Sequence, residues 1–426
     1  MLRILVSSLV CLSLFTGCAS FAASPSPSPF ASTSPSAGPS PAPGPTGAST
    51  APSSSQTPTV SPAASPTSSP DTSSSDSFKV LPGRPPADFV SQITCSGSIG
   101  ASDPVAIVQL HAAVEGTGNV VLRDYANPAS PRTACTFPGG QFRVVQLIDA
   151  RHVVIATSST YAVVDLPEVQ FHWFQLPSYS AFLAVSPGLD QVLWSKAIVA
   201  ASTVEVTVEV HITTSAGDRV VASLPQPLGD RCGSTEDSRR GAFTHSGAHA
   251  FVLDQPFPGK NSLLVIEDEE VVLSLLPPSA GWPEGTHPRM AVWSPTAETL
   301  FYSQGGDVWQ WTPAGGTQRY LSGVNWYFPT ITPDGGHLAY SVVRPDGLHN
   351  VYLVDLAHGG SAQLIGEARN LPVFVNNEQL WYKSEGQGVC GPGSDKPLIY
   401  NLADGSESPS IIDQVFQVWP ATSPNY

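Results

Sequence analysis

Positive charge is scarce in this sequence. Lysine and arginine together number 19 against 34 aspartates and glutamates, which gives a formal net charge of −15. No basic stripe is present. Proteins that bind nucleic acid or anionic lipid through charge present clustered Lys and Arg. We therefore expect no nucleic acid among the partners, and we interpret the acidic excess as favouring solubility and self-repulsion.

Familiar catalytic and metal-binding motifs are also missing. The chain has no Gly-x-Ser-x-Gly, no His-Glu-x-x-His, no Cys-x-x-Cys and no glycine-rich phosphate loop, which are common signatures of acyl transfer, zinc and phosphate sites. His245 and His249 flank an expected turn and do not share a helix face. The acidic run 267–270 lies between two apolar runs and predicts a hairpin turn at the rim. We expect no catalytic residue, no metal and no cofactor.

The amino-terminal segment has the sequence features of a signal peptide. Arg3 precedes an apolar run of twelve residues, 4–15, which is too short for a stable membrane span. The following Thr16-Gly17-Cys18 resembles the lipobox of bacterial lipoproteins. That resemblance implies removal of residues 1–17, lipidation of Cys18, and an extracytoplasmic protein anchored to a bacterial membrane, at the cell surface or in the periplasm. The alternative is an ordinary secretory signal cleaved nearby.

Residues 18–77 have a different composition from the rest. Of the 59 residues after Cys18, 13 are Pro and 27 are Ser or Thr, and Asp71 and Asp76 carry the only charges. Such a segment has too little apolar surface to offset the entropy cost of ordering. We expect a disordered linker between the lipid and a domain at residues 78–426, with the lipid as the only contact to the membrane.

Cysteines are few. Cys11 lies in the signal peptide and Cys18 would carry lipid, which leaves four. An even number in an exported domain is compatible with two disulfides whose pairing the sequence leaves open, and free buried thiols are the alternative. The four candidates are Cys95, Cys135, Cys232 and Cys390.

From residue 78 onward, short runs rich in Val, Ile, Leu, Trp and Tyr alternate with Gly, Pro, Asp and Asn. This pattern predicts strands and turns. One hairpin recurs at 184–195, 292–303 and 331–341, with a degenerate copy at 243–254: a strand ends at Ser/Thr-Pro, a turn follows, and a second apolar strand closes it. A further hairpin completes a four-stranded unit. Units of about 40–50 residues are typical of propeller blades.

The unit at 329–364, with Thr332-Pro333-Asp334-Gly335 and the strand 351–356, resembles the TolB-type, WD-like propeller repeat. The resemblance implies an all-β fold, a single propeller of four-stranded blades. We predict seven blades, with six or eight left open. Residues 78–94 have no repeat of their own, and we expect them to close the ring by adding a strand to the last blade or to pack beside it.

Aromatic and arginine side chains gather in the segments that lead into expected innermost strands, at 237–241, 282–289, 325–328 and 367–370. In a propeller these segments surround the mouth of the central channel. Aromatic and Arg side chains are common in recognition surfaces; the alternative is that they only pack between blades or pair with local acids. The candidate binding residues are Arg239, Arg240, Trp282, His287, Arg289, Trp326, Tyr327 and Arg369.

We interpret the chain as a monomeric, non-catalytic binding module for an envelope protein, peptide or glycan. One alternative is an enzyme, a lyase or glycoside hydrolase acting on extracellular polymers, which would need convergent acids or a His/Tyr/Arg set at the channel mouth. Another is a sensory or structural ectodomain, which the sequence does not distinguish from the first. The specific role of TolB is not implied, because this chain is expected to be tethered and shows no amino-terminal α/β domain.

Overall fold

The computed structural model of this chain describes residues 80–96, 99–110, 120–138, 142–157, 160–199, 206–226, 239–256, 260–283, 285–385 and 395–420. The expected signal peptide, Cys18 and the segment 18–77 lie outside these residues, as do Cys232 and Cys390. The regular elements in the described part are β-strands, and no helix long and apolar enough to cross a membrane is found there.

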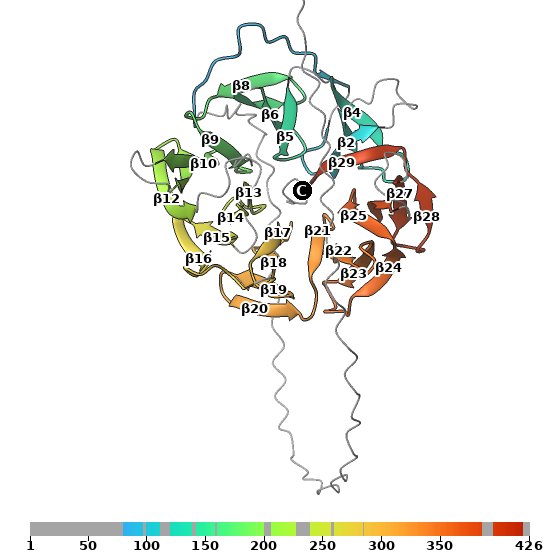
Figure 1. Cartoon of the computed structure of the whole chain (residues 1–426). Coiled ribbons are helices and arrows are strands. Elements are labelled where there is room, and N and C mark those ends of the chain that lie inside the picture. Colours follow the sequence, from blue (N-terminus) through green and yellow to red (C-terminus); the bar gives the residue numbers. More distant parts are fainter. Residues whose placement is uncertain are drawn as a thin grey trace, which may run out of the picture. The chain divides into compact units, whose positions relative to one another are not determined.

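The strands form seven antiparallel sheets, called blades 1 to 7, which stand around a central axis (Figure 1). In blades 2 to 7 four consecutive strands run from the axis outward. Blade 2 contains β5 (Arg143–Leu147), β6 (His152–Ala156), β7 (Tyr161–Asp165) and β8 (Gln170–Phe174). Blade 3 contains β9 (Ser180–Val185), β10 (Gln191–Val199), β11 (Val206–Thr214) and β12 (Gly217–Gln226). Blade 4 contains β13 (Arg239–Phe243), β14 (His249–Asp254), β15 (Ser262–Glu267) and β16 (Glu270–Leu275).

Blades 5 to 7 repeat this order. Blade 5 contains β17 (Arg289–Trp293), β18 (Leu300–Gln304), β19 (Asp307–Thr312) and β20 (Gly316–Leu321). Blade 6 contains β21 (Trp326–Ile331), β22 (His337–Val343), β23 (His349–Asp355) and β24 (Gln363–Glu367). Blade 7 contains β25 (Arg369–Phe374), β26 (Gln379–Ser384), β27 (Lys396–Asn401) and β28 (Glu407–Pro409). The prediction of an all-β propeller with seven blades is confirmed.

Blade 1 closes the ring by joining the two ends of the domain. Its strands are β1 (Thr94–Cys95), β2 (Val105–Leu110), β3 (Val120–Asp124), β4 (Arg132–Phe137) and β29 (Ile412–Trp419), in the order β1-β4-β3-β2-β29. The carboxy-terminal strand β29 pairs with β2 and takes the innermost place (Figure 1). Because strands from both ends of the domain share one sheet, backbone hydrogen bonds between β2 and β29 join the first and last parts of the ring.

The expectation that residues 78–94 close the ring by adding a strand to the last blade, or pack beside that blade, is wrong. The closing pair is made by β29, and Thr94 alone of the segment's described residues enters a strand, β1 at the outer edge of blade 1. The described part of this segment packs beside blade 2, with the Phe89 ring 4.7 Å from that of Trp173. Gly83 lies so close to β8 that a Cβ there would be 2.6 Å from the Phe174 Cα. The innermost position of blade 1 is filled from the other end of the chain, which leaves this segment to cover an outer strand.

The recurrent hairpin of the sequence is one turn between the first and second strands of a blade. The backbone N–H of Ser186 donates to the carbonyl of Gln191 at 3.0 Å, and Thr244 and Thr332 make the same bond to the residue five positions on. A residue with positive φ stands inside this turn, at Gly247 and Gly335. Glycine suits that position because it has no Cβ to clash.

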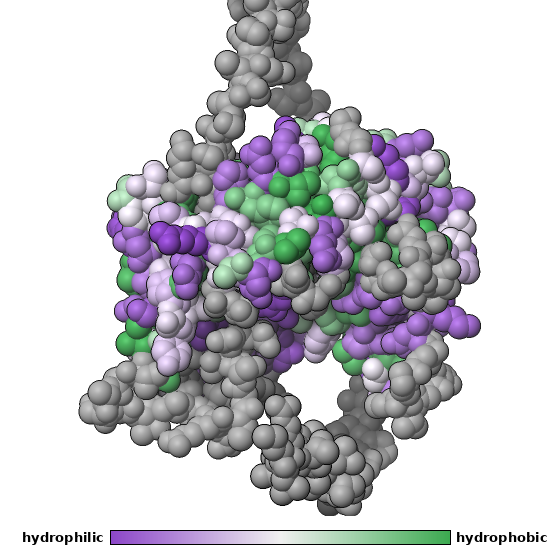
Figure 2. Space-filling model, turned by 90° about the horizontal axis from the view of Figure 1, so that it is seen from above, coloured by the Kyte–Doolittle hydropathy of each residue, from purple (hydrophilic) through white to green (hydrophobic). Residues whose placement is uncertain are grey.

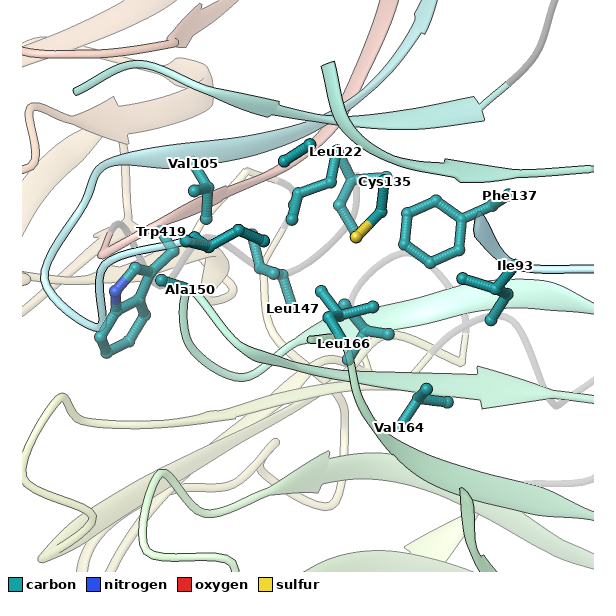
Figure 3. Close-up of a cluster of buried hydrophobic side chains, with 14 of the residues drawn as sticks. Ile93, Val105, Leu122, Cys135, Phe137, Leu147, Ala150, Val164, Leu166 and Trp419 are labelled. Atoms are coloured by element: carbon teal, nitrogen blue, oxygen red, sulfur yellow. The ribbon is translucent and has the colours of Figure 1, made fainter. Parts of the chain in front are cut away.

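The apolar core lies between neighbouring blades. In the cluster between blades 1 and 2, Leu122 and Phe137 face Leu147 and Leu166, and Trp419 of β29 packs at one end (Figure 3). Each such large side chain contributes about 1.5–3 kcal/mol when it is fully buried. Inner strands such as β2 and β6 are buried on both sides, so their continuous apolar runs stabilise the contacts with both neighbouring blades.

A disulfide joins Cys95 and Cys135, which lie opposite each other on β1 and β4 with their Cα atoms 4.0 Å apart. It fixes the outer edge of blade 1. Of the possible pairings among the four candidate cysteines, this one is formed.

The ring has two faces, which we name from the chain direction. The entry face holds the ends at which the first and third strands of each blade begin. The exit face holds the turns between strands one and two and between strands three and four. Because the blades are antiparallel, every residue near a strand end belongs to one face or the other.

Candidate functional site

The candidate residues of the sequence lie on the entry face, but the structure brings only some of them together. A connected group crosses blades 5, 6 and 7, and we call it the polar strip. It contains His287, Arg289, Tyr327, His349, Asn370 and Glu385.

Arg289, the first residue of β17, is the centre of this strip. Its Nε donates to Nε2 of His287 at 2.7 Å, and its Nη1 donates to the Tyr327 hydroxyl at 3.5 Å. Among the residues described, no carboxylate lies within ion-pair distance of Arg289, which is only partly buried. An arginine in an acidic protein is thus held by neutral neighbours and keeps N–H groups for a partner.

His287 is buried, and its surroundings favour the neutral form of its imidazole. Burial lowers its pKa, and the charge of Arg289 lowers the pKa further. A neutral imidazole that accepts at Nε2 carries its proton on Nδ1. Within the described part of the chain that Nδ1 has no hydrogen-bond partner. His287 therefore orients the guanidinium of Arg289 without neutralising its positive charge.

The strip continues from Tyr327 into blade 7. The Tyr327 ring meets the ring of His349 edge-on, with centroids 6.0 Å apart. His349 Nδ1 lies 2.7 Å from Oε1 of Glu385, whose other oxygen accepts the His349 backbone N–H. Tyr327 also pairs in register with Ser341, which donates to Oδ1 of Asn370 at 3.3 Å.

Three strip residues occupy equivalent places in successive blades. Arg289, Tyr327 and Asn370 each precede a β-bulge in the innermost strand. The next residue has a left-handed backbone in every case, at Met290 (φ 39°), Phe328 (φ 50°) and Leu371 (φ 56°). Bulges redirect side chains, and bulky residues adopt this conformation only where the surroundings impose it. The fold thus aims one polar side chain per blade.

Arg369 does not belong to the strip, although the sequence pointed to it. It precedes Asn370 by one residue, and successive side chains of a strand point to opposite faces. Its guanidinium pairs with Glu407 at 2.9 Å and stacks over the Tyr382 ring. Although burial raises the pKa of Glu407, the hydrogen bond from Arg369 brings it below its usual value. Sequence reasoning missed Asn370, and the bulge alignment is the signal that identifies it.

Two other candidates are buried within the fold. Arg239 forms a buried ion pair with Asp254, and Trp326 is fully buried in the core. Arg240 follows on β13, opposite Leu253.

Trp282 helps to position the strip through a chain of two hydrogen bonds. Its indole N–H donates to the Asn261 carbonyl at 2.9 Å, and the Asn261 amide donates to the carbonyl of Pro288 at 2.9 Å. This chain of bonds fixes the segment that carries His287 and Arg289.

The two faces differ in charge. Among the described residues, sixteen acids and four cations lie at the exit ends of strands and turns, whereas seven acids and eleven cations lie at the entry ends; Glu407 is left out because its carboxylate pairs with Arg369 of the entry end. The exit acids are Asp103, Asp124, Asp149, Asp165, Glu168, Asp190, Asp218, Glu267, Asp268, Glu269, Glu270, Glu298, Asp334, Asp355, Glu378 and Asp404, and the exit cations are Arg123, Arg132, Arg151 and Arg219. The entry acids are Asp254, Asp307, Asp346, Glu367, Glu385, Asp395 and Asp413, and the entry cations are Arg143, Lys196, Arg239, Arg240, Lys260, Arg289, Arg319, Arg344, Arg369, Lys383 and Lys396.

The strip brings together an arginine, a tyrosine, two histidines, an asparagine and a glutamate. The described residues contain no group of three or more His, Cys, Asp or Glu placed to hold a metal ion. Glu385 is the only carboxylate in the strip as we define it. Figure 2 looks onto the side of the ring, where hydrophilic residues are interspersed with smaller hydrophobic areas.

Comparison with known proteins finds similar solved structures but no related sequence family. No protein-family model and no curated protein matches the chain. A structure from work on two prolyl endopeptidases aligns with a TM-score of 0.45 and 11% identity, over 73% of this chain and 50% of that one. TolB from Acinetobacter baumannii gives 0.32 and 12%, over 65% and 68%. An oligogalacturonate lyase in complex with manganese gives 0.41 and 12%, over 77% and 89%.

This chain spans about half the length of that prolyl endopeptidase, and at these values the likeness concerns architecture alone. The chain is a seven-bladed β-propeller module, and the case for its function rests on its own side chains.

Proposed function

We propose that this protein is a lipid-anchored, extracytoplasmic propeller that binds an envelope protein, peptide or glycan at its entry face. The observation that carries the proposal is Arg289, a partly exposed guanidinium with no carboxylate partner among the described residues. Its partner would present an anionic group. Tyr327 and His349 beside it offer aromatic surface with polar edges, which is common at binding sites.

The proposed location is supported by two independent features. The segment ending at Cys18 resembles a lipobox, and a lipid on that residue would anchor the chain. The Cys95–Cys135 disulfide belongs to an oxidising compartment, since such bonds are rare in the cytosol. Replacing Cys18 by Ser should move the protein from the membrane fraction to the soluble extracytoplasmic fraction. Unchanged membrane retention would overturn the anchor.

The binding proposal can be tested in intact cells by photo-crosslinking. Val343 is exposed and pairs in register with His349, so a photoreactive amino acid there samples partners and leaves the strip intact. Tyr179, which is 83% exposed in the turn leading into blade 3, is a control position on the same face. We expect an adduct from position 343 and none of the same mass from position 179.

Dependence on Arg289 makes this test specific. A charge-assisted hydrogen bond contributes about 1.5–3 kcal/mol, so Arg289→Ala should reduce the adduct at least tenfold. The matched control is Arg319→Ala in the same blade, because Arg319 is 60% exposed and already faces Asp307 at 3.6 Å. Equal adducts from Arg289→Ala and the parent protein would remove the strip from consideration.

An enzyme remains the second candidate, favoured by one observation: His287, Arg289 and Tyr327 form a connected His/Tyr/Arg set, as a lyase would require. Incubation with purified envelope polysaccharide would decide between the two. Chain cleavage that Tyr327→Phe abolishes would replace binding by catalysis, whereas retention without cleavage would support the binding module.

A further inference from the structure

A cavity of 260 Å³ lies on the exit face between blades 3 and 4. Its lining combines buried apolar side chains, Ile212 of blade 3 and Phe243, Ala250 and Ile266 of blade 4, with the polar side chains of Gln191 and Thr214. Drug-sized ligands occupy pockets of roughly 300–1,000 Å³. This cavity is smaller, and its size suits a single side chain.

The rim of the cavity is acidic. Asp268 and Glu269 form the two-residue turn between β15 and β16 and line the opening. Glu269 is held by Arg219 of blade 3 at 2.9 Å, a contact that spans the gap between the blades. Asp268 is exposed, and among the described residues no cation lies within ion-pair distance of it. One carboxylate is therefore left for an external partner.

The surroundings attract cations. The exit face carries far more acids than cations, as shown above, and a surface of one sign raises the local concentration of oppositely charged partners. Lysine and arginine side chains pack their methylene stems on apolar surface while their charged heads stay at the rim. The buried apolar side chains of the lining match the stem of such a side chain, and the carboxylate of Asp268 matches its charged head.

We propose that this cavity binds a lysine or arginine side chain from a basic segment of a partner protein. The stem lies against Phe243 and Ile266, and the cationic head pairs with Asp268. Gln191 and Thr214, which also line the cavity, offer side-chain oxygens to the remaining N–H groups. This site is separate from the polar strip and stands independently of the function proposed for it.

The test is a binding titration of the exported protein with fluorescently labelled decalysine. Asp268→Asn removes the free carboxylate and keeps a residue that tolerates the left-handed backbone (φ 48°). Glu270→Gln, two residues along the same hairpin and outside the cavity lining, removes the same charge from the same face. We expect Asp268→Asn to weaken binding five- to twentyfold and Glu270→Gln to weaken it less than twofold. Equal losses would show a general field effect and overturn the proposal.

A second variant separates shape from charge. Ala248 is exposed and lines the cavity, so Ala248→Leu fills it without changing the charge. We expect a loss of binding at an unchanged melting temperature, and unaltered binding would contradict the proposal. A titration with spermine distinguishes a free amine from a basic protein segment. If spermine binds as tightly as decalysine and depends on Asp268 in the same way, the cavity takes free amines and the protein partner is ruled out. Arg289→Ala should leave decalysine binding intact, which keeps this test distinct from that of the entry face.

Discussion

Arg239 and Asp254 face each other across the first two strands of blade 4, with Nε 3.2 Å from Oδ1 and 3% and 2% of their side chains exposed. Arg239 also donates to Ser195 of blade 3 at 3.4 Å. Removing one partner of a buried pair leaves the other charge uncompensated, at a cost of about 3–5 kcal/mol. Arg239→Ala should therefore lower the free energy of unfolding in urea by that amount.

The surface pair Arg319–Asp307 is the natural control for that experiment. An exposed ion pair contributes at most about 1 kcal/mol, so Arg319→Ala should leave the urea midpoint nearly unchanged. If both arginine variants shift the midpoint equally, the buried pair has no special role. Any partner screen that replaces Arg239 would otherwise confuse misfolding with loss of binding.

The Cys95–Cys135 disulfide closes a sequence separation of 40 residues. Disulfides of this span stabilise small domains by about 2–4 kcal/mol, mainly by restricting the unfolded chain. We expect Cys95→Ala/Cys135→Ala to lower the urea midpoint accordingly. Adding reductant to the double variant should then change little, and a large further fall would mean that this bond is not the main one.

Gly335 combines a left-handed backbone with a close contact between blades. Its φ is +74°, and a Cβ there would lie 2.3 Å from Oγ1 of Thr296 in blade 5. Gly347 has φ +84° and no atom within 4 Å of its Cβ position. In both Ala variants the left-handed backbone should lower the free energy of unfolding by roughly 1–2 kcal/mol. Gly335→Ala should lower it clearly further, because its Cβ also meets Thr296. Melting curves of the two variants are the measurement. Equal falls in melting temperature would argue against the contact between the turn of Gly335 and the turn of Thr296.

His152 predicts a pH dependence of stability. Burial lowers its pKa, but the hydrogen bond and charge of Asp149, with help from Asp165, raise the pKa above 6.5 overall. The stabilisation is therefore complete below pH 6.5 and is lost as pH rises through the folded-state value. The difference in unfolding free energy between the parent protein and His152→Gln should shrink from pH 5.5 to pH 8.5. A constant difference would mean that the imidazole does not gain its proton on folding.

The blade count could be predicted from sequence because one local turn repeats. Ser186, Thr244 and Thr332 each begin the same hydrogen-bonded hairpin, and local geometry of that kind leaves a visible pattern. Ring closure could not be predicted in the same way. The strand character of residues 412–419 is local, but their pairing with β2 depends on where the seventh blade ends.

The candidate site was half predictable. Arg289 and Tyr327 were identified from composition near the innermost strands, and the structure connects them. Arg369 was chosen in place of Asn370 because the face of a side chain depends on the register, and a one-residue shift reverses it. The burial of Arg239 depends on Asp254, fifteen residues away and opposite it only once the hairpin has formed.

The link between β1 and β4 has a mechanical consequence. If the chain is tethered through Cys18, tension from the membrane enters the propeller by way of residues 80–95. Beyond the contacts of this segment with blade 2, the first covalent link that the tension reaches is the bond from Cys95 to Cys135. Force is thereby passed into the outer edge of blade 1, and the row of hydrogen bonds between β2 and β29 that holds the circle shut is spared from being unzipped.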